Sequence, residues 1–169
     1  MNKEILTISE PARTIRVRTS VDVVVVGGGP SGIMAAEAAA GDGLKVMLLE
    51  SKSFLGGNLT LGLPVLGFLG QKGNQIIRGL PQKFIDRLAA KNAASGHRPC
   101  PLHVSLTIIN PEEVKTTALD VLSEKGVETL FYVFCCGVIK EGNALHGVII
   151  ESKAGREAIL AKKIGRAHV

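Results

Sequence analysis

Aromatic residues and cysteines are scarce in this chain. Of its 169 residues, 4% are aromatic, with no tryptophan and one tyrosine, and three are cysteine. The net charge is +5, but Lys and Arg are scattered among Asp and Glu, and few rings are present to stack on bases. The low aromatic content disfavours an aromatic-cored β-sandwich. The scattered charge argues against nucleic-acid binding.

Long apolar runs are also missing. No run approaches the ~20 residues that span a membrane, and residues 1–20 lack the apolar core of a signal peptide. Cys100, Cys135 and Cys136 form no CxxC pair and no metal-ligand spacing. Because residues 131–139 read as an apolar strand, we expect Cys135 and Cys136 to be buried thiols without a redox role. The sequence therefore predicts a cytoplasmic protein with no membrane span and no metal site.

Hydrophobic residues make up 46% of the chain and glycines number 20, which suits one α/β domain. Residues 22–27 predict a buried strand, residues 30–40 an Ala-rich helix and residues 45–50 a second buried strand, which together form a βαβ unit. Residues 1–20 precede this unit as an arm, with a short extended piece at 14–18. Residues 51–79 are rich in glycine and predict a long functional loop.

The second half predicts two further helices and several strands. A helix starts near Leu80, and another follows Asn110, which is placed as an N-cap before a proline and two acids, with Gly126 as its stop. Candidate strands cover residues 102–109, 127–134, 136–142, 144–152 and 156–164. We expect an α/β fold: a Rossmann-like parallel sheet with a βαβ dinucleotide-binding unit, followed by a small β-meander.

Three glycines form the pattern GxGxxG directly between the first strand and the first helix: Gly27, Gly29 and Gly32. The first glycine permits a tight turn, the second lets a diphosphate approach the backbone, and the third lets helix and strand pack closely. The amides near Ser31 and Gly32 have no partner within a helix and lie at the positive end of its dipole. They can receive phosphate oxygens without a basic side chain.

Glu50 closes the second predicted strand, where a carboxylate can accept hydrogen bonds from both ribose hydroxyls of an adenosine. A 2′-phosphate at the same place would be repelled by this carboxylate. The pattern therefore favours FAD or NAD over NADP.

The stretches DVVVVGGGPSGIMAAEAAAGDGLKVMLLE and SKSFLGGNLTLG resemble the FAD-dependent oxidoreductases with two dinucleotide-binding domains, related to fumarate reductase flavoproteins. In that family a glycine pair and a hydroxyl residue after the acidic strand end lie along the FAD, and Gly56, Gly57 and Thr60 match them. The resemblance thus favours FAD over NAD. The predicted cofactor-binding residues are Gly27, Gly29, Pro30, Ser31, Gly32, Glu50, Ser51, Gly56, Gly57, Asn58 and Thr60.

Relatives continue beyond a strand like residues 156–164 into a second cofactor motif and a substrate domain, whereas this chain reads IGRAHV and stops. We therefore expect an N-terminal fragment, with a truncated FAD/NAD(P)-binding domain at residues 21–163. Codons that match a common sequencing adapter can encode residues 164–169, so we expect a non-native tail there.

The function that we expect is the FAD-binding portion of a flavin-dependent oxidoreductase, inactive as a fragment. Two alternatives stay open: a non-redox NAD- or ADP-binding module, and a thiazole-synthase-like biosynthetic enzyme. The sequence assigns no catalytic residue, because His97, His103 and His146 each occur alone and read as surface or core residues. It leaves the substrate and the oligomeric state unknown.

Overall fold

The structure is a computed structural model, and it describes residues 7–166. Its helices are α1 (Pro30–Gly41), α2 (Leu80–Ala90) and α3 (Pro111–Glu124), with a 3₁₀ turn, η1, at Gly57–Thr60. Its strands are β1 (Arg16–Val26), β2 (Val46–Leu49), β3 (Val65–Leu66), β4 (Arg98–Cys100), β5 (Val104–Thr107), β6 (Glu128–Leu130), β7 (Phe134–Glu141), β8 (Ala144–Ser152) and β9 (Gly155–Arg166).

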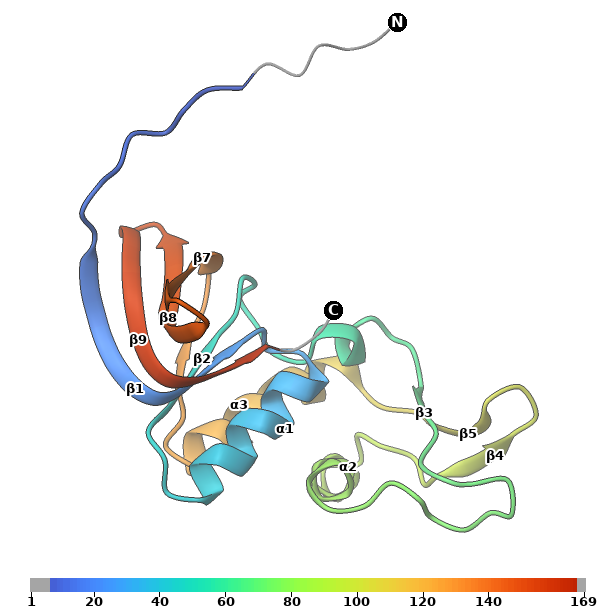
Figure 1. Cartoon of the computed structure of the whole chain (residues 1–169). Coiled ribbons are helices and arrows are strands. Elements are labelled where there is room, and N and C mark those ends of the chain that lie inside the picture. The colour runs from blue at the N-terminus through green and yellow to red at the C-terminus, as the bar shows by residue number, and fades with distance from the viewer. Residues whose placement is uncertain (1–6, 167–169) are drawn as a thin grey trace, which may run out of the picture.

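The main sheet has the strand order β6-β2-β1-β9-β8-β7 (Figure 1). β1 lies at its centre and pairs in parallel with β2 on one side and with β9 on the other. β6 extends the parallel part beyond β2, whereas β7, β8 and β9 form an antiparallel meander. This arrangement confirms the predicted fold class, a Rossmann-like sheet with a βαβ unit and a meander.

α1 and α3 cover one face of this sheet (Figure 1), and apolar residues of α1, α2 and α3 form one large core with it. In α1 the buried positions Ile33 and Ala36 face Val25 and Leu48 of the sheet, within the same cluster. α3 begins as predicted at Asn110, whose side chain accepts hydrogen bonds from the amides of Glu112 and Glu113. This packing holds the N-terminal end of α1 against the end of β1.

The meander builds a second core on strand residues that alternate with those of the first. Val24 and Met47 from the parallel strands pack there with Val148, Ile150 and Ile159 of β8 and β9. Successive residues of a strand point to opposite faces, so Val24 and Val25 serve different cores. The β1–β2 pair therefore lies between the two cores, with one core on each face.

A smaller sheet, β3-β5-β4, was not predicted. It forms a lobe with α2, beside the helices of the main body (Figure 1). β4 could not be predicted from the sequence because Pro99 lies in its middle, and proline disfavours a central strand. β4 tolerates this proline because it is an edge strand. The loop predicted at residues 51–79 likewise contains η1 and β3.

The strand predicted at 127–134 is wrong in its extent, since β6 ends at Leu130. Tyr132 takes a left-handed conformation with a φ of +56°, which breaks the extended chain. The backbone of Glu50 fixes this bend, because its amide donates to the Leu130 carbonyl at 2.9 Å and its carbonyl accepts from the Val133 amide at 3.2 Å. The chain then leaves β6 and enters the meander at β7.

Three further expectations can be compared with the structure: two concern the ends of strands and one concerns the burial of Cys136. β1 starts at Arg16, so residues 16–20 of the expected arm are sheet residues, and residues 1–6 lie outside the described part. β9 continues through Ile164 to Arg166 and pairs with β1 there, whereas residues 167–169 of the predicted tail lie outside the described part. Cys136 is exposed, so the expectation that it is buried was wrong.

No helix in residues 7–166 combines the length and the hydropathy needed to cross a membrane.

Candidate functional site

The glycine turn between β1 and α1 presents bare backbone. Gly27 has a φ of +103°, a conformation that glycine adopts readily and other residues rarely do. The first backbone hydrogen bond of α1 joins the Ile33 amide to the Gly29 carbonyl at 3.0 Å. Within the described residues, the amides of Ser31 and Gly32 therefore have no backbone acceptor. These donors lie at the positive end of the helix dipole, where an anion is favoured.

A second glycine loop lies directly on the first. The Gly56 amide donates to the Gly28 carbonyl at 2.8 Å, and a Cβ on Gly57 would lie 2.9 Å from the Cα of Gly29. Gly56 and Gly57 have φ values of +115° and +49°. The predicted glycine pair is thus more than an ordinary turn, because close contact between the two backbones requires residues without side chains.

These two loops form one wall of a cleft of about 540 Å³. At Gly29 a Cβ would have no protein atom within 4 Å, so it would project into open space at the cleft. The opposite wall comes from the meander and is mostly apolar; it consists of Val133, Phe134, Cys135, Val138, Val148 and Ile164. A cleft of this size, with polar backbone at one wall and apolar side chains at the other, suits an organic cofactor.

Glu50 lies between these walls and is 8% exposed. Its Oε2 accepts a hydrogen bond from the Gly28 amide at 2.7 Å. Its Oε1 accepts from the Ser51 hydroxyl at 3.1 Å and from the Lys52 amide at 2.9 Å. A carboxylate offers about four acceptor positions, so about one is left for a ribose hydroxyl. The sequence had suggested that Glu50 takes both hydroxyls.

The structure gathers most of the predicted cofactor-binding residues in this cleft: Gly27, Gly29, Pro30, Ser31, Glu50, Ser51, Gly57 and Asn58 line it. Gly32, Gly56 and Thr60 do not. Gly32 is buried under the first turn of α1, and the Thr60 hydroxyl donates to the Gly57 carbonyl at 2.7 Å. Thr60 thus closes the 3₁₀ turn that carries Gly57.

Sequence reasoning missed Gly28, the central residue of the three glycines. A Cβ there would lie 2.5 Å from Leu55 Cδ2 and 2.9 Å from Glu50 Oε2. It also missed the meander wall, because strand residues that meet a distant turn carry no local signal. The one signal in the sequence for a role of Gly28 was that it completes a run of three consecutive glycines.

Cys135 lines the apolar wall of the cleft, where burial raises the pKa of its thiol. A raised pKa keeps the thiol protonated and unreactive near neutral pH. Lys52 and Arg166 also line the cleft and bring positive charge to it. In the part of the chain that the structure describes, no histidine lines this cleft.

Replacement of Gly57 by alanine is expected to destabilise the site through both strain and contact. Alanine at a φ of +49° costs about 1–2 kcal/mol, and the 2.9 Å approach to Gly29 adds to that cost. Urea denaturation measures the loss. Gly62→Ala is the matched control, because Gly62 has a φ of +77° and no atom within 4 Å of its Cβ position. Equal losses in the two variants would contradict the backbone contact.

No group of three or more His, Cys, Asp or Glu side chains that could hold a metal ion occurs within residues 7–166. His97 lies away from the cleft, bound to Thr107 and Gln82 through its two ring nitrogens.

Curated relatives match parts of the chain. A thiamine thiazole synthase of Aeropyrum pernix is 32% identical over 130 residues, which cover 76% of this chain and 43% of that protein. A ferredoxin–NADP reductase of Leuconostoc citreum is 41% identical over 69 residues, 37% of this chain and 20% of that protein. The chain spans less than half the length of these curated relatives.

Solved structures share the fold. A flavocytochrome c3 fumarate reductase superposes with a TM-score of 0.67 at 17% identity, over 89% of this chain and 34% of that one. The THI4 protein of Thermovibrio ammonificans gives 0.60 at 20% identity, over 86% and 56%.

The family model described as FAD dependent oxidoreductase matches residues 22–164, which include both glycine loops, Glu50 and the meander. The chain therefore belongs to the FAD-dependent oxidoreductase family, and its cofactor is FAD.

Proposed function

We propose that this chain is the FAD-binding part of a flavin-dependent oxidoreductase and that the cleft between the glycine loops and the meander holds the adenosine diphosphate half of FAD. The observation that carries this proposal is the open space at Gly29. A Cβ there would meet no protein atom, although a second backbone, at Gly57, packs beside it. Space of this kind beside unpartnered amides fits a diphosphate.

Different parts of the cleft suit the phosphates, the ribose and the adenine of the nucleotide. The amide of Ser31, which lines the cleft, would bind a phosphate oxygen, and Glu50 would accept a hydrogen bond from a ribose hydroxyl. Val133, Val138 and Val148 offer an apolar surface for the adenine ring. The buried carboxylate of Glu50 repels a 2′-phosphate, which favours FAD over a phosphorylated dinucleotide.

When bound, FAD supplies the electron transfer of the reaction. The chain's own part is to bind the diphosphate through rigid backbone, to orient the ribose through Glu50 and to exclude water from the apolar wall. The raised pKa of Cys135 leaves it as a neutral part of that wall. The matched parts make up 20% of the ferredoxin–NADP reductase and 43% of the thiamine thiazole synthase, so we propose that the catalytic residues and the substrate site belong to a longer protein. We expect no turnover from residues 1–169 by themselves.

The similarity to thiamine thiazole synthases favours one alternative, a biosynthetic enzyme that uses the same adenosine-binding turn without a flavin. The cleft described above fits the adenosine half of FAD and that of NAD equally. The choice therefore depends on the ligand that the protein retains.

Nucleotide retention tests these functions. Purified protein should be yellow, release FAD on denaturation, and bind added FAD at least tenfold more tightly than NAD in calorimetric titrations. ADP should bind in competition with FAD, because it shares the diphosphate and the ribose. Tighter binding of NAD with no retained flavin would support the thiazole-synthase-like alternative. A folded protein that binds none of the three would contradict the proposed site.

The three described cysteines are all free, which agrees with a reducing compartment, so we propose the cytoplasm as the location.

A further inference from the structure

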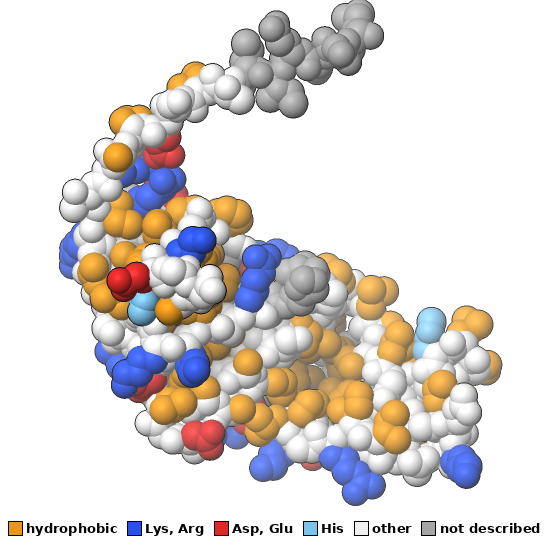
Figure 2. Space-filling view, viewed as in Figure 1, with side chains coloured by type: hydrophobic (Ala, Val, Ile, Leu, Met, Phe, Trp, Pro, Cys, Tyr) orange, Lys and Arg blue, Asp and Glu red, His pale blue; other side chains and the backbone are white. Residues whose placement is uncertain are grey.

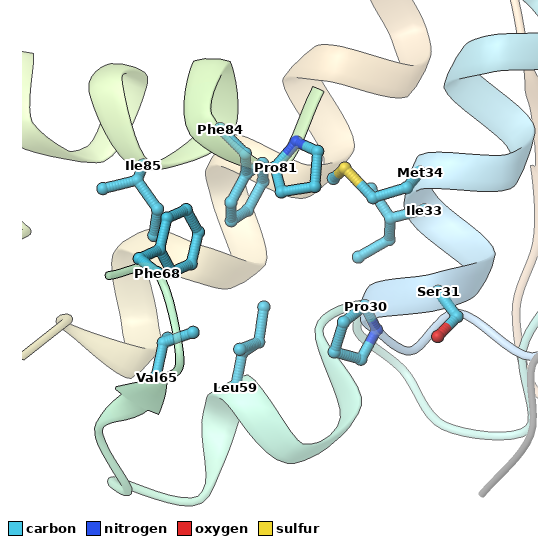
Figure 3. A pocket seen from close by; sticks show the side chains of 10 residues that line it. All are labelled: Pro30, Ser31, Ile33, Met34, Leu59, Val65, Phe68, Pro81, Phe84 and Ile85. Carbon is cyan, nitrogen blue, oxygen red and sulfur yellow. The ribbon is translucent and has the colours of Figure 1, made fainter. Parts of the chain in front are cut away.

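A second cavity opens on the other side of the first turn of α1, between the main body and the small lobe (Figure 3). Its volume is about 220 Å³. The space-filling view shows hydrophobic side chains gathered in the hollow between these two parts (Figure 2). The side chains that form most of its surface are Ile33 and Met34 of α1, Leu59 of η1, Phe68, and Phe84 and Ile85 of α2.

The chemistry of this lining is almost uniform. Ser31, at the edge of the cavity, contributes the only polar side chain among the lining residues, and none of them is charged. An ion would lose its hydration there without gaining a partner. A dry apolar cavity of about 150 Å³ is known to take a benzene-sized molecule, so this one has room for a slightly larger neutral ring.

The wall at Phe68 is held in place. The Phe68 ring is 4% exposed and stacks on the His97 ring, with centroids 4.4 Å apart and an angle of 16° between the planes. The His97 ring is fixed at both nitrogens, 2.6 Å from Thr107 Oγ1 and 2.9 Å from Gln82 Oε1. The His97 ring, held by these two hydrogen bonds, thus stabilises the position of the Phe68 ring through the stacking contact.

The cavity also adjoins the FAD cleft. Pro30 and Ser31 line both spaces, so the two are separated by a single residue pair at the start of α1. A group in the cavity would lie within one helix turn of the proposed diphosphate site. An occupant would therefore be close to the cofactor without competing for the donors that bind it.

We propose that this cavity binds a neutral, apolar, ring-sized group of a second ligand, which lies beside the diphosphate of the bound FAD. The proposal rests on the proposed function for the identity of the neighbouring ligand. The apolar lining selects a neutral group, and the volume selects one or two fused rings. The stacking of His97 on Phe68 keeps the cavity open in the absence of the ligand.

Indole is a suitable probe, and its binding to the full chain saturated with FAD is measured by ligand-detected NMR. We expect saturable binding that is weakened at least tenfold by Met34→Trp, because the new indole ring fills the cavity. Ala35→Trp is the matched control: Ala35 is the next residue of α1 and is exposed, so this variant should bind the probe as the original chain does. Val65→Phe, from another wall, repeats the blockade if Met34→Trp does not fold.

Indole binding that persists in folded Met34→Trp and Val65→Phe variants would overturn the proposal. Indole binding that is seen in the FAD-free chain and lost on saturation with FAD would also overturn it, since the cavity would then belong to the cofactor. FAD affinity is measured in the same samples without indole. Failure of the original chain to bind FAD contradicts the proposed function, whereas loss of the difference between Met34→Trp and Ala35→Trp contradicts only the cavity.

Discussion

Replacement of Gly29 by valine is expected to abolish FAD binding while the free energy of unfolding stays nearly unchanged. Gly29 has a φ of −74° and a ψ of −177°, which valine adopts without strain. No protein atom lies within 4 Å of its Cβ position, so the fold has room for the side chain. The isopropyl group would instead stand in the space of the diphosphate. We expect FAD to bind at least 100-fold more weakly, a loss of about 2.8 kcal/mol.

Calorimetric titration with FAD measures this effect, and urea denaturation measures the stability. Gly41→Val is the matched control, because Gly41 also has free space at its Cβ position but lies at the other end of α1. That variant should bind FAD normally. If Gly29→Val retains the affinity of the original chain, the diphosphate does not lie at the glycine turn.

The second large effect is expected from Glu50→Ala, which should lower both stability and affinity. The carboxylate is buried and accepts hydrogen bonds from Gly28, Ser51 and Lys52. Its removal leaves these donors without a protein acceptor, at a cost of about 2–4 kcal/mol in the free energy of unfolding. FAD should bind at least tenfold more weakly, because the turn that faces the diphosphate loses its support at Gly28 and the ribose loses an acceptor.

Glu50→Gln separates these contributions. The amide keeps one acceptor oxygen but turns an NH₂ group toward a backbone donor, so we expect a smaller loss than in Glu50→Ala. Glu128→Ala, at an exposed glutamate at the start of β6, should change neither quantity. An unchanged urea midpoint in Glu50→Ala would refute the supporting role. An unchanged FAD affinity would remove the carboxylate from the site.

The part of the site that could be predicted from sequence is the part that local chain geometry determines. Gly27, Gly29 and Gly32 are spaced for a strand, a turn and a helix in immediate succession, and Asn110 with Pro111 marks a helix start. Such signals act over a few residues, so they survive in a single sequence. The family resemblance added Gly56 and Gly57, which the structure places against the turn.

The rest depends on residues that meet only after folding. The role of Gly28 depends on Leu55 and Glu50, and the meander wall depends on how β7 and β8 curl back over β1 and β2. The His97 contacts join α2 to β5, two elements that the sequence treated separately. Thr60 was predicted to lie along the cofactor, and in the structure its hydroxyl donates to the Gly57 carbonyl, a contact that the sequence does not reveal.

The central place of β1 also bears on how the protein is made. β1 can pair with β2 soon after both emerge from the ribosome, but its other neighbour, β9, is synthesised much later. Until β9 arrives, one edge of the strand that leads into the glycine turn is bare and open to pairing with other chains. We therefore expect the nascent chain to acquire FAD late, after its meander has docked, and to need protection from aggregation until then.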